Sequence, residues 1–431
     1  MREIACPLAL VVSLALVQFA CEASGSGEEV AGGGAGGAVD DAGREGSTYD
    51  ASACKTADYE LVRTPTNLFL MVDRSSSMWS IACGGESRWK AISDAVVQFM
   101  QASDSQNAGL GVGFFPMVDA ALTPCATVAD CTETQECVSG VAHDFPICMD
   151  ACSAPADCGA HHQCAELDGS SVCSSSRCDS AAYSVAAVDI GPMSDEAHRN
   201  AVFTGFQQYG PLTLTPTLPA LGGAVEYATA WMLKTTPGQR VAVVLVTDGP
   251  PTECFPQNGA TAAAAIGASA EVAGKAAAAL PPVETFVVAL TSGGEDTTQL
   301  VQIAQAGGTG MAHEVQADPQ LPVALADVLG EVLTAAGRSC DYVIPDDALP
   351  WAPGRINVTI GSADSEPLPY VAGPSGCSGG EAGWHYDVDP AEAKPHRILL
   401  CGASCEVVAL STGRVGLQTG CETVGGTSGA P

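Results

Sequence analysis

Acidic and hydroxyl-bearing residues stand directly after a predicted strand, in an arrangement that could hold a divalent cation. An Asp-x-Ser-x-Ser segment runs from Asp73 to Ser77 and follows an apolar run at residues 67–72. Because side chains alternate along an extended loop, Asp73, Ser75 and Ser77 are expected to point towards one spot. Carboxylate and hydroxyl oxygens are the hard ligands that Mg²⁺ prefers. The pattern therefore predicts a cation site, the alternative being that Ser75 and Ser77 only cap the following turn.

Two later segments carry further oxygen-bearing side chains, which a family resemblance groups with the motif. Thr215 and Thr217 precede an amphipathic helix expected at residues 218–233, and Asp248 follows a strand expected at residues 240–246. In open α/β sheets, ligands bind beside the carboxyl ends of the strands. Three segments at three such ends indicate one shared site more strongly than the five-residue motif alone. The alternative for Asp248 is that it begins a loop.

Alternating strands and helices are expected to position these residues. Apolar runs predict strands at residues 67–72, 109–115, 183–190, 240–246, 285–290 and 311–315. Segments with helical spacing lie between or after them, at residues 88–101, 194–209, 218–233, 261–280, 297–306 and 321–335. This alternation predicts an α/β fold with a doubly wound, mostly parallel sheet. Trp89 falls on the core face of its helix, whereas Trp79 is a candidate binding aromatic beside the motif.

A cysteine-rich block at residues 119–180 interrupts the alternation between the second and third strands. Two units of about 25 residues repeat the same four-cysteine pattern and share Ala-Asp-Cys, which indicates an internal duplication. Units this small cannot bury an apolar core, so two disulfides are expected in each, with the pairing left open. The repeated cysteines are Cys125, Cys131, Cys137 and Cys148, then Cys152, Cys158, Cys164 and Cys173.

The start of the chain indicates export. Arg2 and the apolar run after it predict a signal peptide at residues 1–20, which is too short to span a bilayer in the mature protein. Cys21 follows Ala20 as in a lipobox, although Gln18 departs from that pattern. A lipid anchor on Cys21 and plain cleavage that releases a soluble exported protein both remain open.

The number of cysteines supports export independently. The chain has 19, a density typical of compartments in which disulfides persist. Without Cys6 and Cys21 an odd number remains, so one thiol is expected to stay free or to pair outside this set.

Net charge excludes some partners. With 17 basic and 49 acidic residues, the formal charge is −32. Nucleic acid is not an expected partner, because its phosphates need Lys and Arg. Membrane contact is expected only through a lipid on Cys21. The acidity concentrates divalent cations near the surface but does not identify a function.

Composition divides the rest of the chain. Residues 21–58 are rich in Gly and Ala and predict a flexible tether, followed by the α/β domain at residues 59–338. A small β-rich domain is expected at residues 339–431, with cysteines as staples. Its predicted strands lie at residues 355–360, 397–400, 406–410 and 415–419.

Other candidate sites are weaker. His161 and His162 lie between cysteines and would suit zinc, but cysteines in an oxidising compartment favour disulfides. Cys401 and Cys405 are expected in disulfides on the same ground. His313 lacks the second histidine of a metalloprotease helix, and the sequence carries no nucleophile elbow or phosphate loop.

Taken in order along the chain, Asp73-x-Ser75-x-Ser77, Thr215 and Asp248 resemble the metal-ion-dependent adhesion site of the von Willebrand factor type A family. The resemblance covers roughly residues 60–338 without the cysteine-rich block. It implies that Ser75, Ser77 and Thr215 bind the ion through hydroxyls, and that Asp73 and Asp248 bind directly or through water. It also implies that metal occupancy can move the last helix, at residues 321–335.

The resemblance implies adhesion or protein recognition outside the cytoplasm, without catalysis. Mg²⁺ is the expected ion, with Mn²⁺ or Ca²⁺ as alternatives, and the expected partner is a protein that presents an acidic side chain. Two other functions remain open. One is a structural envelope component whose metal only stabilises the fold, and the other is a hydrolase with its site in the C-terminal domain.

Overall fold

Six strands form the central sheet of the computed structural model, in the order β12-β11-β10-β3-β4-β9. All neighbouring pairs are parallel except β4 and β9, which confirms the predicted α/β fold with a mostly parallel sheet. The strands are β3 (Thr66–Asp73), β4 (Gly109–Phe115), β9 (Val188–Pro192), β10 (Arg240–Thr247), β11 (Thr285–Thr291) and β12 (His313–Gln316).

The structure describes most of the chain after the predicted tether. The described residues are 57–81, 85–102, 105–119, 121–234, 239–255, 261–292, 297–337, 340–345, 352–361, 365–377, 381–410 and 414–425. The predicted signal peptide, Cys21 and most of the predicted tether lie outside them. Among the described residues, none of the helices combines the length and apolar character needed to cross a bilayer.

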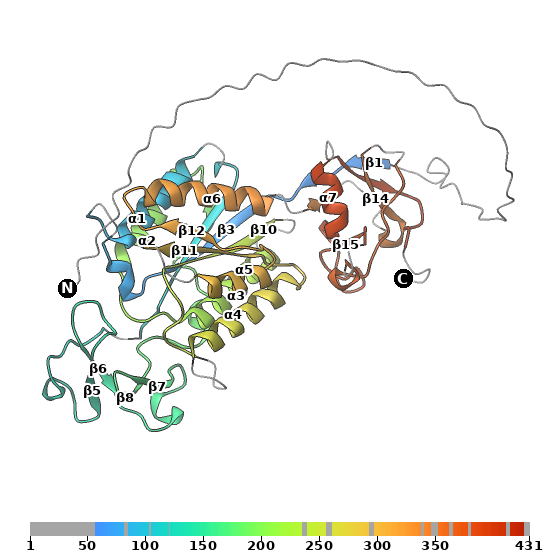
Figure 1. Cartoon of the computed structure of the whole chain (residues 1–431). Coiled ribbons are helices and arrows are strands. Elements are labelled where there is room, and N and C mark those ends of the chain that lie inside the picture. Colours follow the sequence, from blue (N-terminus) through green and yellow to red (C-terminus); the bar gives the residue numbers. More distant parts are fainter. Residues whose placement is uncertain are drawn as a thin grey trace, which may run out of the picture. The chain divides into compact units, whose positions relative to one another are not determined.

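Helices cover both faces of the central sheet (Figure 1). One face carries α1 (Arg88–Gln101), α2 (Glu196–Gln208) and α6 (Leu321–Gly337). The other carries α3 (Thr217–Lys234), α4 (Ala262–Ala277) and α5 (Thr298–Ala306). Side chains of β3 alternate between the two cores, because successive residues of a strand face opposite sides of the sheet. This double burial explains why the strand reads as one apolar run.

The strand expected at residues 183–190 begins later than predicted. Tyr183 follows a short 3-10 helix, is buried, and donates its hydroxyl to the Arg177 carbonyl. The ring therefore enters the core from a turn, and strand pairing starts only at Val188. That strand is the antiparallel edge of the sheet.

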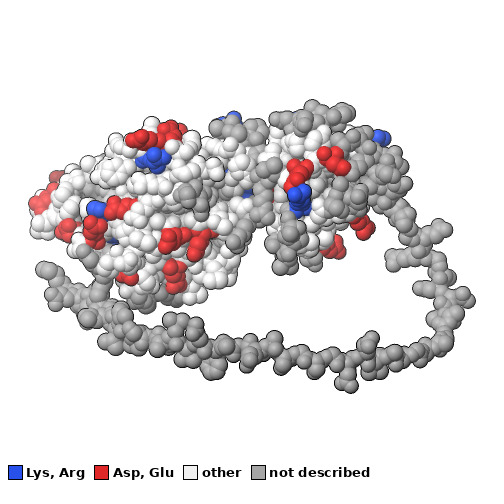
Figure 2. Space-filling model, turned by 90° about the horizontal axis from the view of Figure 1, so that it is seen from above, with Lys and Arg blue, Asp and Glu red and all other residues white. Residues whose placement is uncertain are grey.

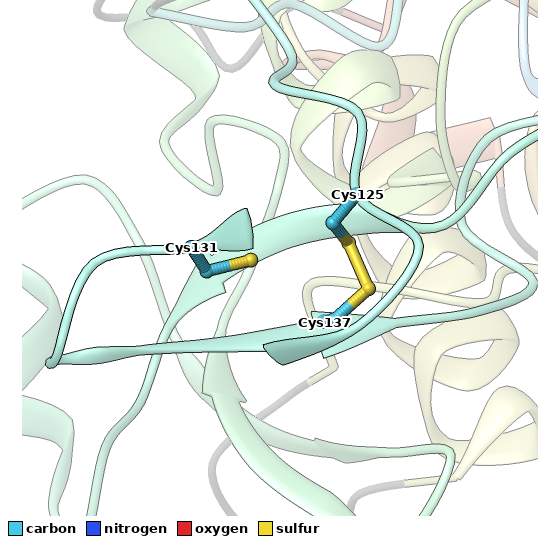
Figure 3. Close-up of side chains that lie close together, drawn as sticks. All are labelled: Cys125, Cys131 and Cys137. Atoms are coloured by element: carbon cyan, nitrogen blue, oxygen red, sulfur yellow. A yellow bond between two sulfur atoms is a disulfide. The ribbon is translucent and has the colours of Figure 1, made fainter. Parts of the chain in front are cut away.

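The cysteine-rich block folds as two β-hairpins with the same disulfide pattern. The hairpins are β5 (Gln135–Val138) with β6 (Ile147–Asp150), and β7 (Cys164–Leu167) with β8 (Ser170–Cys173). In each unit the first cysteine pairs with the third and the second with the fourth. The pairs are Cys125–Cys137, Cys131–Cys148, Cys152–Cys164 and Cys158–Cys173. Figure 3 shows the Cys125–Cys137 bond, with Cys131 nearby. The matching connectivity supports the duplication.

The C-terminal part contains two small sheets and a helix. The sheets have the orders β1-β17-β14 and β15-β16-β13-β2. Their C-terminal strands are β13 (Asp341–Val343), β14 (Ile356–Ile360), β15 (Trp384–Tyr386), β16 (Arg397–Leu400) and β17 (Val415–Thr419). Two other strands come from before the central sheet, β1 (Ala57–Glu60) and β2 (Val62–Arg63). Residues 57–63, assigned above to the tether and the α/β domain, therefore pair with C-terminal strands.

The strand predicted at residues 406–410 is wrong, because this segment belongs to helix α7 (Gly402–Leu410). Cys405 and Val408, three residues apart, both pack in the C-terminal core, which is helical spacing. Two disulfides, Cys340–Cys405 and Cys377–Cys401, hold the start of the helix. A short apolar run does not by itself distinguish a strand from a buried helix.

Candidate metal site

The two aspartates of the predicted site lie at the same edge of the central sheet. Asp73 is the last residue of β3, and Asp248 directly follows β10, its parallel neighbour. Parallel strands that pair in register bring their carboxyl ends together. After Asp73 the chain enters a short 3-10 helix, η1 (Ser76–Trp79). The fold thus brings the motif and Asp248 together, although 175 positions separate the two aspartates in the printed sequence.

Hydrogen bonds connect four of the five predicted ligands. The Ser75 amide donates to Asp73 Oδ1 at 2.7 Å. The hydroxyls of Ser75 and Ser77 lie 2.9 Å apart, and Ser77 Oγ donates to Asp248 Oδ1 at 2.7 Å. Asp73, Ser75, Ser77 and Asp248 therefore form one hydrogen-bonded cluster.

Burial makes this cluster electrostatically costly. Asp73 is fully buried, and the Asp248 side chain is only 3% exposed. Burial, together with the negative charge of Asp248, raises the pKa of Asp73 to about 7. Two buried carboxylates so close together need positive charge if both are to be ionised.

The third loop lies beside the motif, but its threonines are not hydrogen-bonded to the four connected residues. The Ser76 amide donates to the Thr213 carbonyl at 2.7 Å, which aligns the two loops. The Thr215 amide donates a hydrogen bond to the Thr252 hydroxyl at 2.9 Å. Thr217 is buried, and its hydroxyl has no hydrogen-bond partner within the described residues. The loop is therefore adjacent to the site, and the choice of Thr215 as ligand remains a prediction.

Two residues at the site were not among the sequence candidates. Thr247 donates its hydroxyl to Asp73 Oδ2 at 2.7 Å. Arg88, the first residue of α1, forms an ion pair with Asp248, its Nη1 lying 2.5 Å from Oδ2. The sequence contains a signal for Arg88. A positive charge in the first turn of a helix is unfavourable because of the helix dipole, and a nearby acidic side chain would stabilise it.

Arg74 lies within the motif, and Trp79 follows it by two positions. Arg74 is buried, donates Nε to the Pro116 carbonyl at 2.8 Å, and lies 5.3 Å from the Tyr209 ring centroid. Burial lowers the pKa of Arg74 to about 10. Trp79 is 46% exposed and donates its indole N–H to the Pro211 carbonyl at 3.2 Å. A fixed, exposed aromatic therefore stands beside the motif, as expected, while Trp89 is in the core.

A cavity of about 340 Å³ lies next to Asp248, between the carboxyl ends of β10 and β11 and the start of α5. Its lining includes Gly249, Thr291 and Gln299. The side-chain carbonyl of Gln299 is buried and has no hydrogen-bond partner in the part of the chain that is described. Of the predicted ligands, Asp248 lines this cavity.

The donor set fits a divalent cation. Two carboxylates and the neighbouring hydroxyls supply only oxygen ligands, the type preferred by Mg²⁺, Mn²⁺ and Ca²⁺. With both aspartates ionised, one negative charge remains after the ion pair of Asp248 with Arg88, and a cation would offset it.

The histidine and cysteine candidates have other partners. His162 is hydrogen-bonded to the Ser174 carbonyl and to Asp119, and His161 lies 3.2 Å from Asp179. Each of the 15 cysteines in the described ranges is disulfide-bonded, Cys401 and Cys405 included. Cys54 and Cys83, on which the predicted odd thiol depends, lie outside those ranges.

Comparison with known proteins gives distant structural likenesses only. A scan against protein-family models and a search of curated protein sequences both find no match. The pilus adhesin SpaC from Lactobacillus rhamnosus GG, in an open conformation, is 12% identical with a TM-score of 0.36, over 82% of this chain and 38% of that one.

Two further solved structures are similar at the same level. Proximal thread matrix protein 1 from the mussel byssus, with a zinc-occupied MIDAS motif, is 12% identical with a TM-score of 0.32, over 66% of this chain and 50% of that one. The vWF domain of the type V pili tip protein Mfa5 from Porphyromonas gingivalis is 10% identical with a TM-score of 0.31, over 63% of this chain and 96% of that one. This chain spans only 38 to 51% of the length of the first neighbours. The site is therefore interpreted from its own geometry.

Proposed function

We propose that this protein binds a partner outside the cytoplasm through a divalent cation held by Asp73, Ser75, Ser77, Thr215 and Asp248, in a site of the von Willebrand factor type A kind. One observation carries the proposal: two buried carboxylates and the two serines of the motif form one hydrogen-bonded cluster at the carboxyl edge of the sheet. Mg²⁺ is the proposed ion, with Mn²⁺ and Ca²⁺ as alternatives.

The residues that hold the ion favour an acidic partner. Ser75, Ser77 and Thr215 are neutral, so they bring oxygen without cancelling positive charge. When bound, the ion would offer an open coordination position that a carboxylate of the partner can fill. Trp79, exposed beside the motif, would add apolar contact area around that carboxylate. The proposed activity is therefore recognition of an acidic side chain.

The disulfides support a location in an oxidising compartment. All 15 described cysteines are bonded, which is typical of extracytoplasmic proteins. Acidic side chains are spread over the described part of the face seen in Figure 2, with basic ones sparser among them. A signal peptide at residues 1–20 and a lipid on Cys21 complete the proposal, as the route by which the protein would reach and stay at the cell surface.

Calorimetric titration with Mg²⁺ or Mn²⁺ tests the metal site. We expect saturable binding by the full chain, and loss of it in Asp73→Asn/Asp248→Asn, which keeps side-chain volume. Because the acidic surface also attracts cations, Glu226→Gln/Glu271→Gln is the matched control; it removes two exposed carboxylates and should bind as the wild type does. Equal affinity in the Asp73/Asp248 variant would contradict the site.

Affinity capture from the cell envelope, with and without EDTA, tests the recognition role. Capture that requires the ion and fails in the Asp73/Asp248 variant supports binding through the metal. A protein whose melting temperature falls with EDTA while capture is unchanged would instead use the metal only to stabilise its fold.

A further inference from the structure

Arg88 places a positive charge at the proposed cation site. Its side chain is 10% exposed, and its guanidinium contacts Asp248 through Nη1 and the Ser292 hydroxyl through Nη2. Its Nε has no hydrogen-bond partner among the described residues. The guanidinium brings positive charge and donors only, with no acceptor.

Both oxygens of Asp248 are engaged, by groups of different character. Ser77 donates its hydroxyl to Oδ1, and Arg88 binds Oδ2. A hydroxyl can rotate and become a metal ligand, whereas a guanidinium has no acceptor to offer a cation. An ion at the site would therefore share Asp248 with Arg88.

The charge balance depends on this one residue. With both aspartates ionised, Asp73, Asp248 and Arg88 together carry one negative charge, and the two aspartates alone would carry two. A bound divalent ion would leave a net positive charge with Arg88 present and none without it. The N-terminus of α1, where Arg88 sits, adds further positive potential.

The following inference rests on the proposed function. We propose that Arg88 is a specificity-determining residue, which weakens binding of the ion alone and strengthens joint binding of the ion with a carboxylate. The residual positive charge opposes the cation and attracts the anion. By linkage, the ion and a carboxylate then raise one another's affinity. At a given ion concentration the site would be filled more completely when an acidic ligand is present.

Mn²⁺ titration of the full chain tests this role, with acetate as the carboxylate probe and chloride at matched ionic strength as the reference. In chloride, Arg88→Gln should bind Mn²⁺ about tenfold more tightly than the wild type, because a repelling charge is removed from a weakly screened site. Acetate should tighten Mn²⁺ binding in the wild type clearly more than in Arg88→Gln. Arg199→Gln removes a positive charge from α2, where Nη1 donates to the Met193 carbonyl, and should behave as the wild type does.

A second variant covers the case in which Arg88→Gln fails to fold. Arg88→Ala leaves space for a free guanidinium ion, and millimolar guanidinium should weaken its Mn²⁺ binding towards the wild-type value without affecting the wild type. Equal or weaker Mn²⁺ binding by both Arg88 variants, or no effect of acetate, would overturn the role of Arg88 while leaving the metal site in place. Absence of binding in the wild type and in both variants would overturn the metal site and this inference together.

Discussion

Thr247 shows how a single hydroxyl positions a buried carboxylate. It ends β10 and donates to Asp73 Oδ2 at 2.7 Å, while the Ser75 amide holds Oδ1. Without these bonds the Asp73 carboxylate would be buried without partners, which is expensive. Thr247 thus orients a proposed ligand without binding the ion itself.

Replacing Thr247 by valine should harm both stability and metal binding. We expect a loss of about 2 kcal/mol in the free energy of unfolding, because Asp73 Oδ2 is left unpaired. Metal affinity should fall about tenfold, as is usual when an orienting partner of a ligand is lost. Thermal unfolding and Mn²⁺ calorimetry measure the two effects. Thr285→Val is the control: this threonine is also in a buried strand, but its hydroxyl has no hydrogen-bond partner in the described residues, so neither quantity should fall.

Glu253 gives the fold a dependence on pH. Its carboxylate is buried and accepts hydrogen bonds from the amide and the hydroxyl of Ser175. Burial raises the pKa of Glu253 above its usual value of 4.5. A raised folded-state pKa means that the neutral acid stabilises the fold below pH 4.5, and that this stabilisation is lost as pH rises through the raised value.

Glu253→Gln should therefore gain stability relative to the wild type as pH rises. The amide keeps an acceptor for Ser175 but never ionises, so the difference in melting temperature should grow from acidic to neutral pH. Glu226→Gln, an exposed change on α3, should follow the wild type throughout. A constant difference between Glu253→Gln and the wild type would show that Glu253 ionisation does not affect the fold.

Sequence alone located the motif residues because their signal is local. Asp73, Ser75 and Ser77 lie within five positions, after an apolar run that marks a buried strand. The ion pair of Arg88 with Asp248 spans 160 positions, and no local pattern encodes which strand ends beside which helix. Thr247 was visible at the end of its strand, but its contact with Asp73 depends on the order of strands in the sheet.

At the scale of elements, the disulfide Cys178–Cys254 ties the cysteine-rich block to the loop after β10. Cys254 has a φ of 59°, in the left-handed region that non-glycine residues avoid, so the loop is held in a strained conformation. Two residues earlier, Thr252 supports the Thr215 amide, and Glu253 contacts Ser175 of the block. The block and the metal-site loops are thus connected at this point.

Removing this disulfide should affect the fold and the site together. For Cys178→Ala/Cys254→Ala we expect a loss of about 4 kcal/mol in unfolding free energy, from the long loop that the bond closes, and weaker Mn²⁺ binding. Cys125→Ala/Cys137→Ala should cost about 3 kcal/mol because its loop is shorter, and should leave Mn²⁺ affinity unchanged. Equal affinities in both variants would mean that the block and the site are independent.

The elements that sequence predicted well are those buried on both faces. The apolar runs at residues 67–72 and 240–246 were predicted as strands and lie in β3 and β10, in which every residue is buried. Errors occurred where tertiary contacts decide the conformation. Tyr183 turns into the core ahead of β9, and α7 forms where an apolar run next to two cysteines suggested a strand. Propensity carries little information at such positions.

At the scale of the whole molecule, a buried ion-pair network joins the central sheet to the C-terminal strands. Asp341, the first residue of β13, contacts Arg240 of β10 at 3.0 Å and Arg397 of β16 at 3.1 Å. Arg240 also donates to the Ala336 carbonyl at 3.1 Å, near the end of α6. The family resemblance implies that α6 moves with metal occupancy. Such a movement would have to break the hydrogen bond of Arg240 with the Ala336 carbonyl or move the ion-pair network with the helix.

Asp341→Asn should be strongly destabilising. The change removes the charged carboxylate that two buried arginines share and leaves each with one ion-pair partner, Glu284 or Asp387, at a cost of about 3 kcal/mol in unfolding free energy. Chemical denaturation measures it. Glu60→Gln is the control, because Glu60 pairs with Arg414 at 3.6 Å with both side chains well exposed, and it should change stability by less than about 0.5 kcal/mol. Similar effects of the two changes would deny the network a structural role.

The pairing of β1 with β17 and of β2 with β13 has a consequence for biosynthesis. The first strands to be made find their partners only among the last, so the C-terminal sheets cannot close until almost the whole described chain has been synthesised and delivered. The central sheet, whose strands lie between, can form earlier and shorten the distance that this closure must cover. A fragment comprising only the residues after α6 would lack an edge strand from each sheet and expose their backbone groups to aggregation. The first and the last strand of the described chain can therefore pair with one another only after the segment between them has been made.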